Sequence, residues 1–200
     1  MRRRVDELLT QEGDTAGAEF KQEPGCRRLA NLADKGDAFR NVLAHPLVLE
    51  GARHVLGPDL KLSSLNARSA DPGGGARPLD ADLVALPDAK GSWVCNTIRM
   101  LDACTQDDGA IGLVPGSHRR GRPPPQAPAD PLADRPGQVL VTGRAGTVVV
   151  PNAHARHACT AHRAGRPRAA LQDLDGDGAL DAVVFTARKG RRHVSTVVPV

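Results

Sequence analysis

Residues 139–171 read VLVTGRAGTVVVPNAHARHACTAHRAGRPRAAL. Two short valine-rich runs, at 138–142 and 146–150, flank a glycine-containing corner and so predict two neighbouring strands. Beyond these strands the stretch carries His157 and, eleven residues later, Arg168. It therefore places a histidine and an arginine beside a predicted sheet.

The regions around this stretch extend the strand pattern and precede it with helices. The first sixty residues predict helices, because Val5, Leu8 and Leu9 share one helical face. A later helix is expected to have Pro46 in its first turn. Turn residues separate further candidate strands at 61–69, 93–101, 110–114 and 182–187. Helices followed by many short strands predict an α+β protein, mainly β, whose sheets form a sandwich or barrel.

The length of 200 residues, with 40% apolar side chains, predicts one globular domain over residues 1–200. Within it we expect a helical part at 1–60, a β core at 61–170 and a divergent tail at 171–200. Only 2% of the residues are aromatic, so the core must be built from leucine, valine and alanine.

Composition also excludes several classes of protein. The net charge of +4 comes from arginines spread along the whole chain, and few aromatic side chains are present to stack on bases, so nucleic-acid binding is not expected. The four cysteines show neither zinc-site nor disulfide spacing, which favours a reducing cytoplasmic location. No apolar run reaches 18 residues, so no membrane span is expected. The oligomeric state is left open.

Three further runs carry a family resemblance. They are LGPDLKLSSLNARSA (56–70), PLDADLVALPDAKGSWVCNT (78–97) and DDGAIGLVPGSHRRG (107–121). With the stretch at 139–171, they make the chain resemble the phytanoyl-CoA dioxygenase-like family. The resemblance implies a double-stranded β-helix, which is a jelly-roll, cupin-like fold. It also implies binding of Fe(II), 2-oxoglutarate and O2, and hydroxylation of a small organic or lipid-like molecule.

The resemblance further implies roles for four residues. Oxygenases of this kind hold Fe(II) by two histidines and one carboxylate on one face of the metal. Asp82 falls on the family's carboxylate position, and His157 falls on its distal histidine. Arg168 falls on the arginine that pairs with the far carboxylate of 2-oxoglutarate. Asn66 matches a position that helps to hold 2-oxoglutarate in relatives, although an asparagine in a strand is also commonly hydrogen-bonded to its neighbours.

The first metal ligand departs from the family pattern. Relatives have histidine two residues before the carboxylate, whereas this chain has Asp80 two residues before Asp82. Aspartate is shorter than histidine, adds a negative charge and is a harder ligand, so the site shifts toward Mg²⁺ or Mn²⁺ relative to Fe(II). His154 and His162 lie at odd spacings from His157, on the opposite face of a regular strand, so neither is expected to replace the missing histidine.

The tail carries a second candidate site. Its D-x-D-x-D-G-x-x-D pattern resembles loops that wrap Ca²⁺, with the candidate ligands Asp173, Asp175, Asp177 and Asp181. Val184 stands where an EF-hand has its bidentate glutamate, which argues against a true EF-hand. An acidic turn without calcium explains the same residues.

Three functional hypotheses follow from these patterns. In the first, Asp80, Asp82 and His157 hold the metal of a working 2-oxoglutarate-dependent dioxygenase. In the second, the chain is a catalytically inactive relative that binds a ligand or a partner protein. The change of histidine to Asp80 favours this second hypothesis for turnover. The third, a calcium-binding module, rests on the tail alone.

Overall fold

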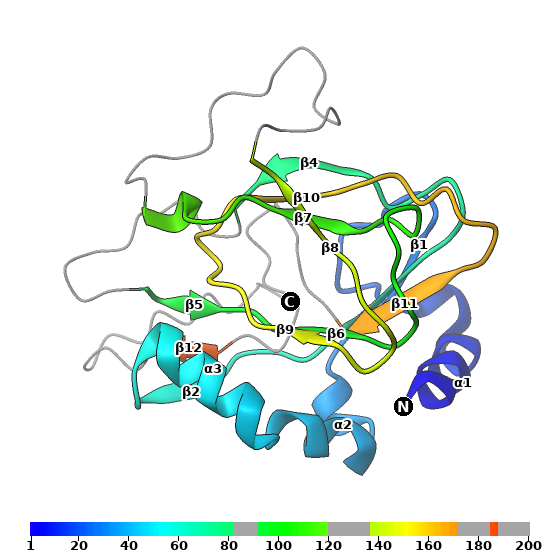
Figure 1. Ribbon diagram of the computed structural model, residues 1–200. Helices are drawn as coiled ribbons and strands as arrows, with labels where there is room; N and C mark the ends of the chain where they lie inside the picture. Colours follow the sequence, from blue (N-terminus) through cyan, green and yellow to red (C-terminus); the bar gives the residue numbers. More distant parts are fainter. Residues whose placement is uncertain (82–91, 120–136, 172–184, 188–200) are drawn as a thin grey trace.

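The computed structural model describes residues 1–81, 92–119, 137–171 and 185–187 (Figure 1). The helices in these ranges are α1 (Arg2–Glu12), α2 (Asp37–Leu43) and α3 (Pro46–Leu56), with 3₁₀ turns η1 (Gly13–Thr15), η2 (Leu32–Asp34) and η3 (Ser117–Arg119). The strands are β1 (Cys26–Leu29), β2 (Leu60–Leu62), β3 (Ala67–Ala70), β4 (Arg77–Asp80), β5 (Val94–Cys95), β6 (Ile98–Met100), β7 (Ile111–Leu113), β8 (Val139–Val141), β9 (Val148–Val149), β10 (His157–Cys159), β11 (Arg168–Leu171) and β12 (Phe185–Ala187).

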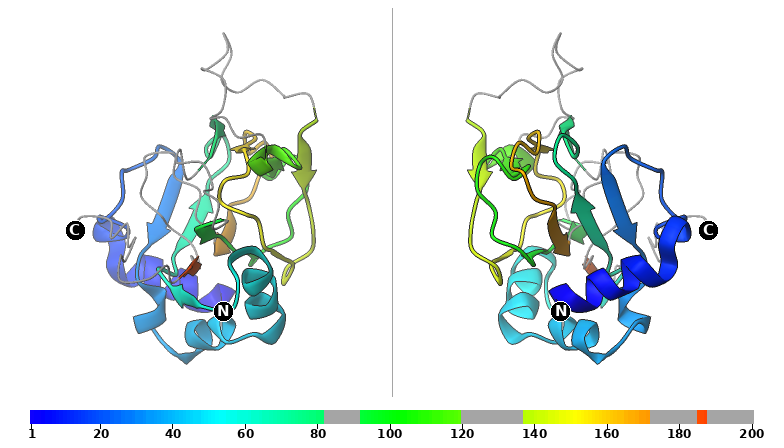
Figure 2. Two further views of the ribbon diagram at one scale, coloured as in Figure 1. Left: turned by 90° about the vertical axis from the view of Figure 1, so that its left-hand side faces the viewer. Right: turned by 90° about the vertical axis from the view of Figure 1, so that its right-hand side faces the viewer.

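The strands form antiparallel sheets that face each other. One sheet has the order β1-β3-β11-β6-β9 and another has the order β4-β10-β7-β8. A third, three-stranded sheet has the order β2-β12-β5. In Figure 1 the four-stranded sheet lies above β6, β9 and β11, and Figure 2 shows the helices gathered below the strands from both sides.

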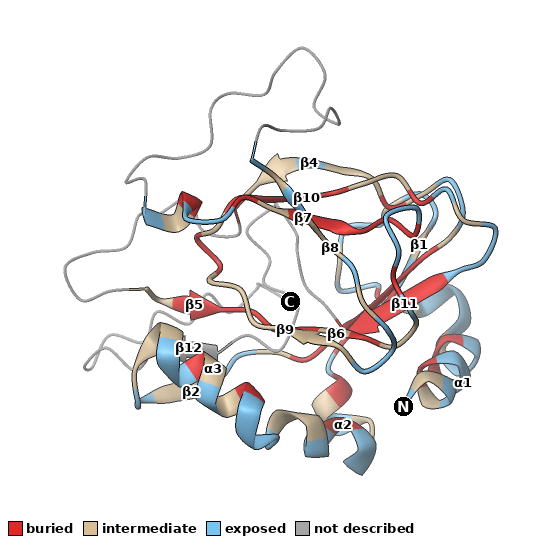
Figure 3. Cartoon of the chain, in the orientation of Figure 1, coloured by how far each residue is buried: buried red, intermediate tan, exposed pale blue. Residues whose placement is uncertain are grey.

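Helix α1 packs against β1 of the five-stranded sheet, and α3 packs against β2, β5 and β12 of the three-stranded sheet. Leu29, Ala67 and Leu171 from three adjacent strands belong to the same buried cluster as the inner faces of α1 and α3. Figure 3 shows this division, with β11 buried along its length and the outer faces of the helices exposed. Because side chains alternate along a strand, the neighbours of these residues point the other way, toward the four-stranded sheet. That second face forms the candidate site.

The helix predictions are confirmed. Val5, Leu8 and Leu9 form the buried face of α1, and Pro46 occupies the first turn of α3. This helix ends at Gly57, whose φ of 89° is a conformation that suits glycine. The prediction for the first sixty residues was nevertheless incomplete, because they also contain strand β1.

The strand predictions are largely confirmed, with two corrections. The predicted strand at 93–101 is two strands of different sheets, β5 and β6. The predicted strand at 61–69 is two strands, β2 and β3, which belong to different sheets. The chain leaves one sheet and enters another between β2 and β3. The sequence at 61–69 gives no sign of this change of sheet. The candidate strand at 182–187 includes β12, which pairs with β2 and β5.

The cysteines and the helices were also the subject of sequence predictions. All four cysteines are free thiols. Among the helices of the described ranges, none is both long enough and apolar enough to cross a membrane.

Candidate metal and co-substrate site

The pairing of β4 with β10 brings Asp80 next to His157. His157 is the register partner of Asp80, and Cys159 is the partner of Arg77. Three steps along β4 therefore match two steps along β10, which is a β-bulge in β4. Because register partners on antiparallel strands share a face, Asp80 and His157 lie on the same side of the sheet.

That shared face points into the space between the two sheets. Cys159, two residues after His157, packs with Ile111 and with Ile98 of the opposite sheet. His157 is only 5% exposed, and its Nδ1 lies 3.0 Å from the carbonyl oxygen of Ala155. Because a carbonyl can only accept, Nδ1 donates in this bond and carries a proton. Histidines that bind metals are commonly oriented in this way.

Asp80 is half-buried beside this histidine. Its Oδ1 accepts a hydrogen bond of 2.7 Å from the backbone nitrogen of Ala81. Asp82, the expected family carboxylate, lies outside the described residues. Within the described ranges, histidine, cysteine and acidic side chains do not gather in a group of three that could hold a metal ion. The metal assignment therefore remains a prediction in which Asp80 and His157 are placed and Asp82 is not.

Arg168 is buried at the start of β11, with 2% of its surface exposed. Its terminal Nη2 donates to the carbonyl oxygen of Gly109 at 3.1 Å. Its Nε–H has no hydrogen-bond acceptor, and no carboxylate pairs with the side chain in the part of the chain that the structure describes. Buried arginines usually have an anionic partner. This guanidinium is therefore suited to receive a carboxylate from a ligand.

The loop that holds Arg168 is itself well fixed. Asp108, next to Gly109, accepts two hydrogen bonds of 2.7 Å from the backbone and the hydroxyl of Thr105. Burial by itself raises the pKa of Asp108, but these bonds from Thr105 and the charge of Arg166 bring the pKa below its ordinary value. The Asp108 carboxylate thus orders the turn that contains Gly109, and the Gly109 carbonyl oxygen accepts the hydrogen bond from Arg168.

Two other histidines have contacts of their own. The ring nitrogens of the fully buried His162 lie 3.2 Å and 2.7 Å from the carbonyl oxygens of Asp107 and Arg166. The ring of His154 lies edge-on to Trp93, with 6.3 Å between ring centroids. These contacts favour structural roles for both rings.

Asn66 is buried just before β3. Its Oδ1 accepts a hydrogen bond of 3.1 Å from the backbone nitrogen of Asn31, a residue with a positive φ of 54°. This bond joins residues 35 positions apart in the chain, and the co-substrate role of Asn66 stays a prediction. The aspartates of the tail, Asp173, Asp175, Asp177 and Asp181, lie outside the described residues.

Sequence reasoning missed a group of charged residues on the inner face. Arg68 on β3 is 2% exposed and pairs with Glu23 at 2.6 Å. Arg28 and Arg77 also approach the same carboxylate, at 3.6 Å and 3.8 Å. The available signal was the position of Arg68, two residues after Asn66 and hence on the same face of an extended chain.

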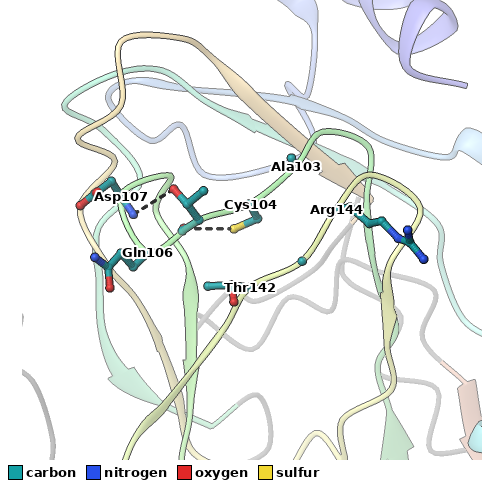
Figure 4. Close-up of a pocket in the computed structure, with 8 residues that line it drawn as sticks. Ala103, Cys104, Gln106, Asp107, Thr142 and Arg144 are labelled. Carbon is teal, nitrogen blue, oxygen red and sulfur yellow. Dashed lines mark hydrogen bonds between the residues drawn. The ribbon is translucent and has the colours of Figure 1, made fainter.

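A surface hollow of about 670 Å³ lies at the end of the sandwich where β11 begins (Figure 4). Loops 103–107 and 142–144 line it, and Arg144 points away from the other lining side chains. Cys104 is one of its lining residues. Burial raises the pKa of this thiol, while the charge of Arg168 acts in the opposite direction. The lining segments lie just before β7 and just after β8, at the end where Ile111 pairs with Val141, whereas His157 pairs with Leu113 at the other end of β7.

Comparison with known proteins agrees with this geometry. The family described as Phytanoyl-CoA dioxygenase (PhyH) matches residues 1–170. The chain belongs to the phytanoyl-CoA dioxygenase family. A family relative, "Dioxygenase af480" of Aspergillus fumigatus, is 31% identical over 98 residues. That match covers 48% of this chain and 32% of the relative, so the chain matches about a third of the relative's length.

Solved structures confirm the jelly-roll fold expected for the phytanoyl-CoA dioxygenase family. HygX from Streptomyces hygroscopicus, solved with nickel and 2-oxoglutarate, matches with a TM-score of 0.69 at 15% identity, over 92% of this chain and 78% of its own. The carbocyclase SnoK from nogalamycin biosynthesis, a non-haem α-ketoglutarate-dependent enzyme, matches with a TM-score of 0.65 at 22% identity, over 93% and 73%. At these identities the likeness concerns the fold.

Proposed function

We propose that this protein is a non-haem Fe(II)- and 2-oxoglutarate-dependent dioxygenase that hydroxylates a small organic or lipid-like substrate. One observation carries the proposal. Asp80 and His157 are register partners on the inner face of one sheet, while the buried Arg168 of the facing sheet keeps an Nε–H without an acceptor in the described residues. A metal and a carboxylate ligand would satisfy both features.

The family and the solved relatives support the same chemistry. HygX was solved with nickel, 2-oxoglutarate and hygromycin B, and SnoN was solved with Fe³⁺, α-ketoglutarate and nogalamycin RO. By this analogy the substrate of the present chain is a small molecule rather than a macromolecule. Its chemical identity is not part of the proposal.

Each residue of the site has a definite role in this proposal. His157, Asp80 and Asp82 would hold the metal, and Arg168 would bind the far carboxylate of 2-oxoglutarate through paired N–H donors. Bound Fe(II), 2-oxoglutarate and O2 supply the oxidation of a substrate C–H bond, with succinate and CO2 as the other products. Ile98, Ile111 and Cys159 pack between the sheets and limit the access of water to the inner face.

The direct test is turnover of the co-substrate. With Fe(II), ascorbate and O2, the parent protein is expected to release succinate from 2-oxoglutarate, and His157→Ala should reduce that release to background because one metal ligand is lost. The measurement is succinate formed per protein, with Asn152→Ala as a nearby control. Equal rates in the parent and in His157→Ala would contradict the metal assignment.

A second function is favoured by one specific feature, the aspartate at position 80. If the resulting site holds Fe(II) too weakly for turnover, the chain is a ligand-binding relative without catalysis. In that case 2-oxoglutarate would still bind at Arg168, but no succinate would form.

Calcium binding by the tail remains a separate proposal, to which the proteins named above give no support. If Asp173, Asp175, Asp177 and Asp181 wrap Ca²⁺, calcium at a hundred times its Kd should stabilise the fold by about 2.7 kcal/mol. This corresponds to a rise in Tm of roughly 5–10 °C for a chain of this size. Asp175→Ala should abolish the rise in a thermal-shift measurement. An unchanged Tm in the parent would reduce the loop to an acidic turn.

A further inference from the structure

The β3–β4 connection, residues 71–76, carries the chain from the five-stranded sheet to the four-stranded sheet. In the described ranges no backbone pairing joins β1 with β4, the edge strands of these two sheets. The carboxylate of Glu23 instead contacts both ends of the connection. It accepts a hydrogen bond of 2.6 Å from Arg68 on β3 and lies 3.8 Å from Arg77, the first residue of β4. Glu23 therefore bridges the two sheets.

The position of Glu23 is itself fixed by its surroundings. Its carboxylate also lies 3.6 Å from the buried Arg28, whose guanidinium group lies over the ring of Phe20 at 4.4 Å. The backbone next to it packs directly on the β3–β4 connection, because a Cβ atom on Gly74 would lie only 2.7 Å from the carbonyl oxygen of Gly25. Glu23 is thus a rigid point to which the start of β4 is attached.

Strand β4 is held less firmly by its own sheet. It is an edge strand, and in the described ranges it pairs with β10 alone. Its register partners are His157 for Asp80 and Cys159 for Arg77, with the bulge between them. Pro78 lies inside this bulge and has no N–H to donate to the ladder. The backbone pairing of β4 is therefore a weak constraint on the position of Asp80.

We propose that Glu23 and Arg77 are positioning residues for the metal site, because their ion pair holds the start of β4 and so sets how Asp80 faces His157. The inference rests on the proposed function for the role of Asp80 as a metal ligand. The side chains of Glu23 and Arg77 are 21% and 20% exposed. An ion pair with this access to water adds little to global stability, so its effect is expected mainly in β4.

Arg77→Gln is the principal test, because it removes the attachment of β4 and leaves Glu23 bonded to Arg68. Amide hydrogen exchange of the metal-free protein should become several-fold faster in β4 and stay unchanged in β7 and β8, since an edge strand can open locally. Ni²⁺ binding, followed by calorimetry, should weaken about tenfold, as is usual when a residue that orients a metal ligand is lost.

Three further variants distinguish positioning from a general loss of stability. Arg77→Lys keeps the positive charge and should recover most of the Ni²⁺ affinity. Glu23→Gln should weaken Ni²⁺ binding as Arg77→Gln does, and the double variant should show no further loss, because both act through one contact. Arg27→Gln is the matched control. Its guanidinium group lies 3.9 Å from Asp71 of the same connection, but it is half-exposed, so both measurements should remain unchanged.

Each outcome decides the role of the ion pair. Unchanged Ni²⁺ affinity in a folded Arg77→Gln overturns the proposal, whether exchange in β4 is altered or not. Faster exchange in every strand would make the ion pair a general clasp and would also overturn it. A parent protein that does not bind Ni²⁺ contradicts the proposed function. The exchange measurement then decides alone: faster exchange confined to β4 in Arg77→Gln supports the placing of this strand by Glu23, and unchanged exchange overturns it.

Discussion

Replacement of Arg168 by alanine is expected to weaken 2-oxoglutarate binding by about 2–5 kcal/mol, the usual cost of truncating one partner of a buried charged pair. This corresponds to a rise in Kd of roughly 30-fold to several thousand-fold. The reason is geometric. The guanidinium is buried, its Nη2 is fixed by Gly109, and its Nε–H has no acceptor in the described residues until a carboxylate arrives. Calorimetric titration of 2-oxoglutarate, with Ni²⁺ in place of Fe(II), measures the effect without turnover.

Arg168→Lys provides the matched comparison. Lysine retains the charge but presents a point donor instead of a planar fork, so its affinity should lie between those of the parent and the alanine variant. Thermal melting in the absence of ligand shows whether either variant has lost the fold. Unchanged affinity in a folded Arg168→Ala would show that the co-substrate binds elsewhere and would remove Arg168 from the site.

The parts of the fold that could be predicted are those in which apolar residues repeat at the spacing of a helix or a strand. Helix α1 was found because Val5, Leu8 and Leu9 repeat at helical spacing and are all buried. Strand β1, with the sequence Cys-Arg-Arg-Leu, was missed. Leu29 lies in the helix-side core, Arg28 lies on the charged inner face and Arg27 is exposed, so the strand shows no apolar-polar alternation.

The site could be predicted only in part for a related reason. The positions of His157 and Arg168 follow from family-like runs in the sequence. The register that places Asp80 opposite His157 depends on a bulge in β4, which no local pattern in that strand indicates. The partnership of Glu23 with Arg68 joins residues 45 positions apart through an irregular segment, so it emerges only when the sheets are assembled.

Asp80→His is expected to tighten Fe(II) binding at least about tenfold, or about 1.4 kcal/mol, and to raise the rate of 2-oxoglutarate-dependent succinate release above that of the parent. The imidazole reaches further from the same backbone position, is neutral, and restores two histidines and one carboxylate around the metal. Asp80 is suitably placed for this change, because it is the register partner of His157 and shares its inward face. Fe(II) affinity and uncoupled succinate release can both be measured without knowing the substrate.

Asp80→Asn is the control that separates charge from ligand type. Asparagine has the shape of aspartate and no charge, but it lacks the imidazole nitrogen, so Fe(II) binding should not improve. Adding Arg168→Ala to Asp80→His should suppress the restored succinate release, since the carboxylate clamp is lost. A parent that already turns over 2-oxoglutarate, and that Asp80→His slows, would establish Asp80 as a working ligand. If neither protein binds iron, the site differs from its relatives by more than one ligand, and the non-catalytic function is the correct one.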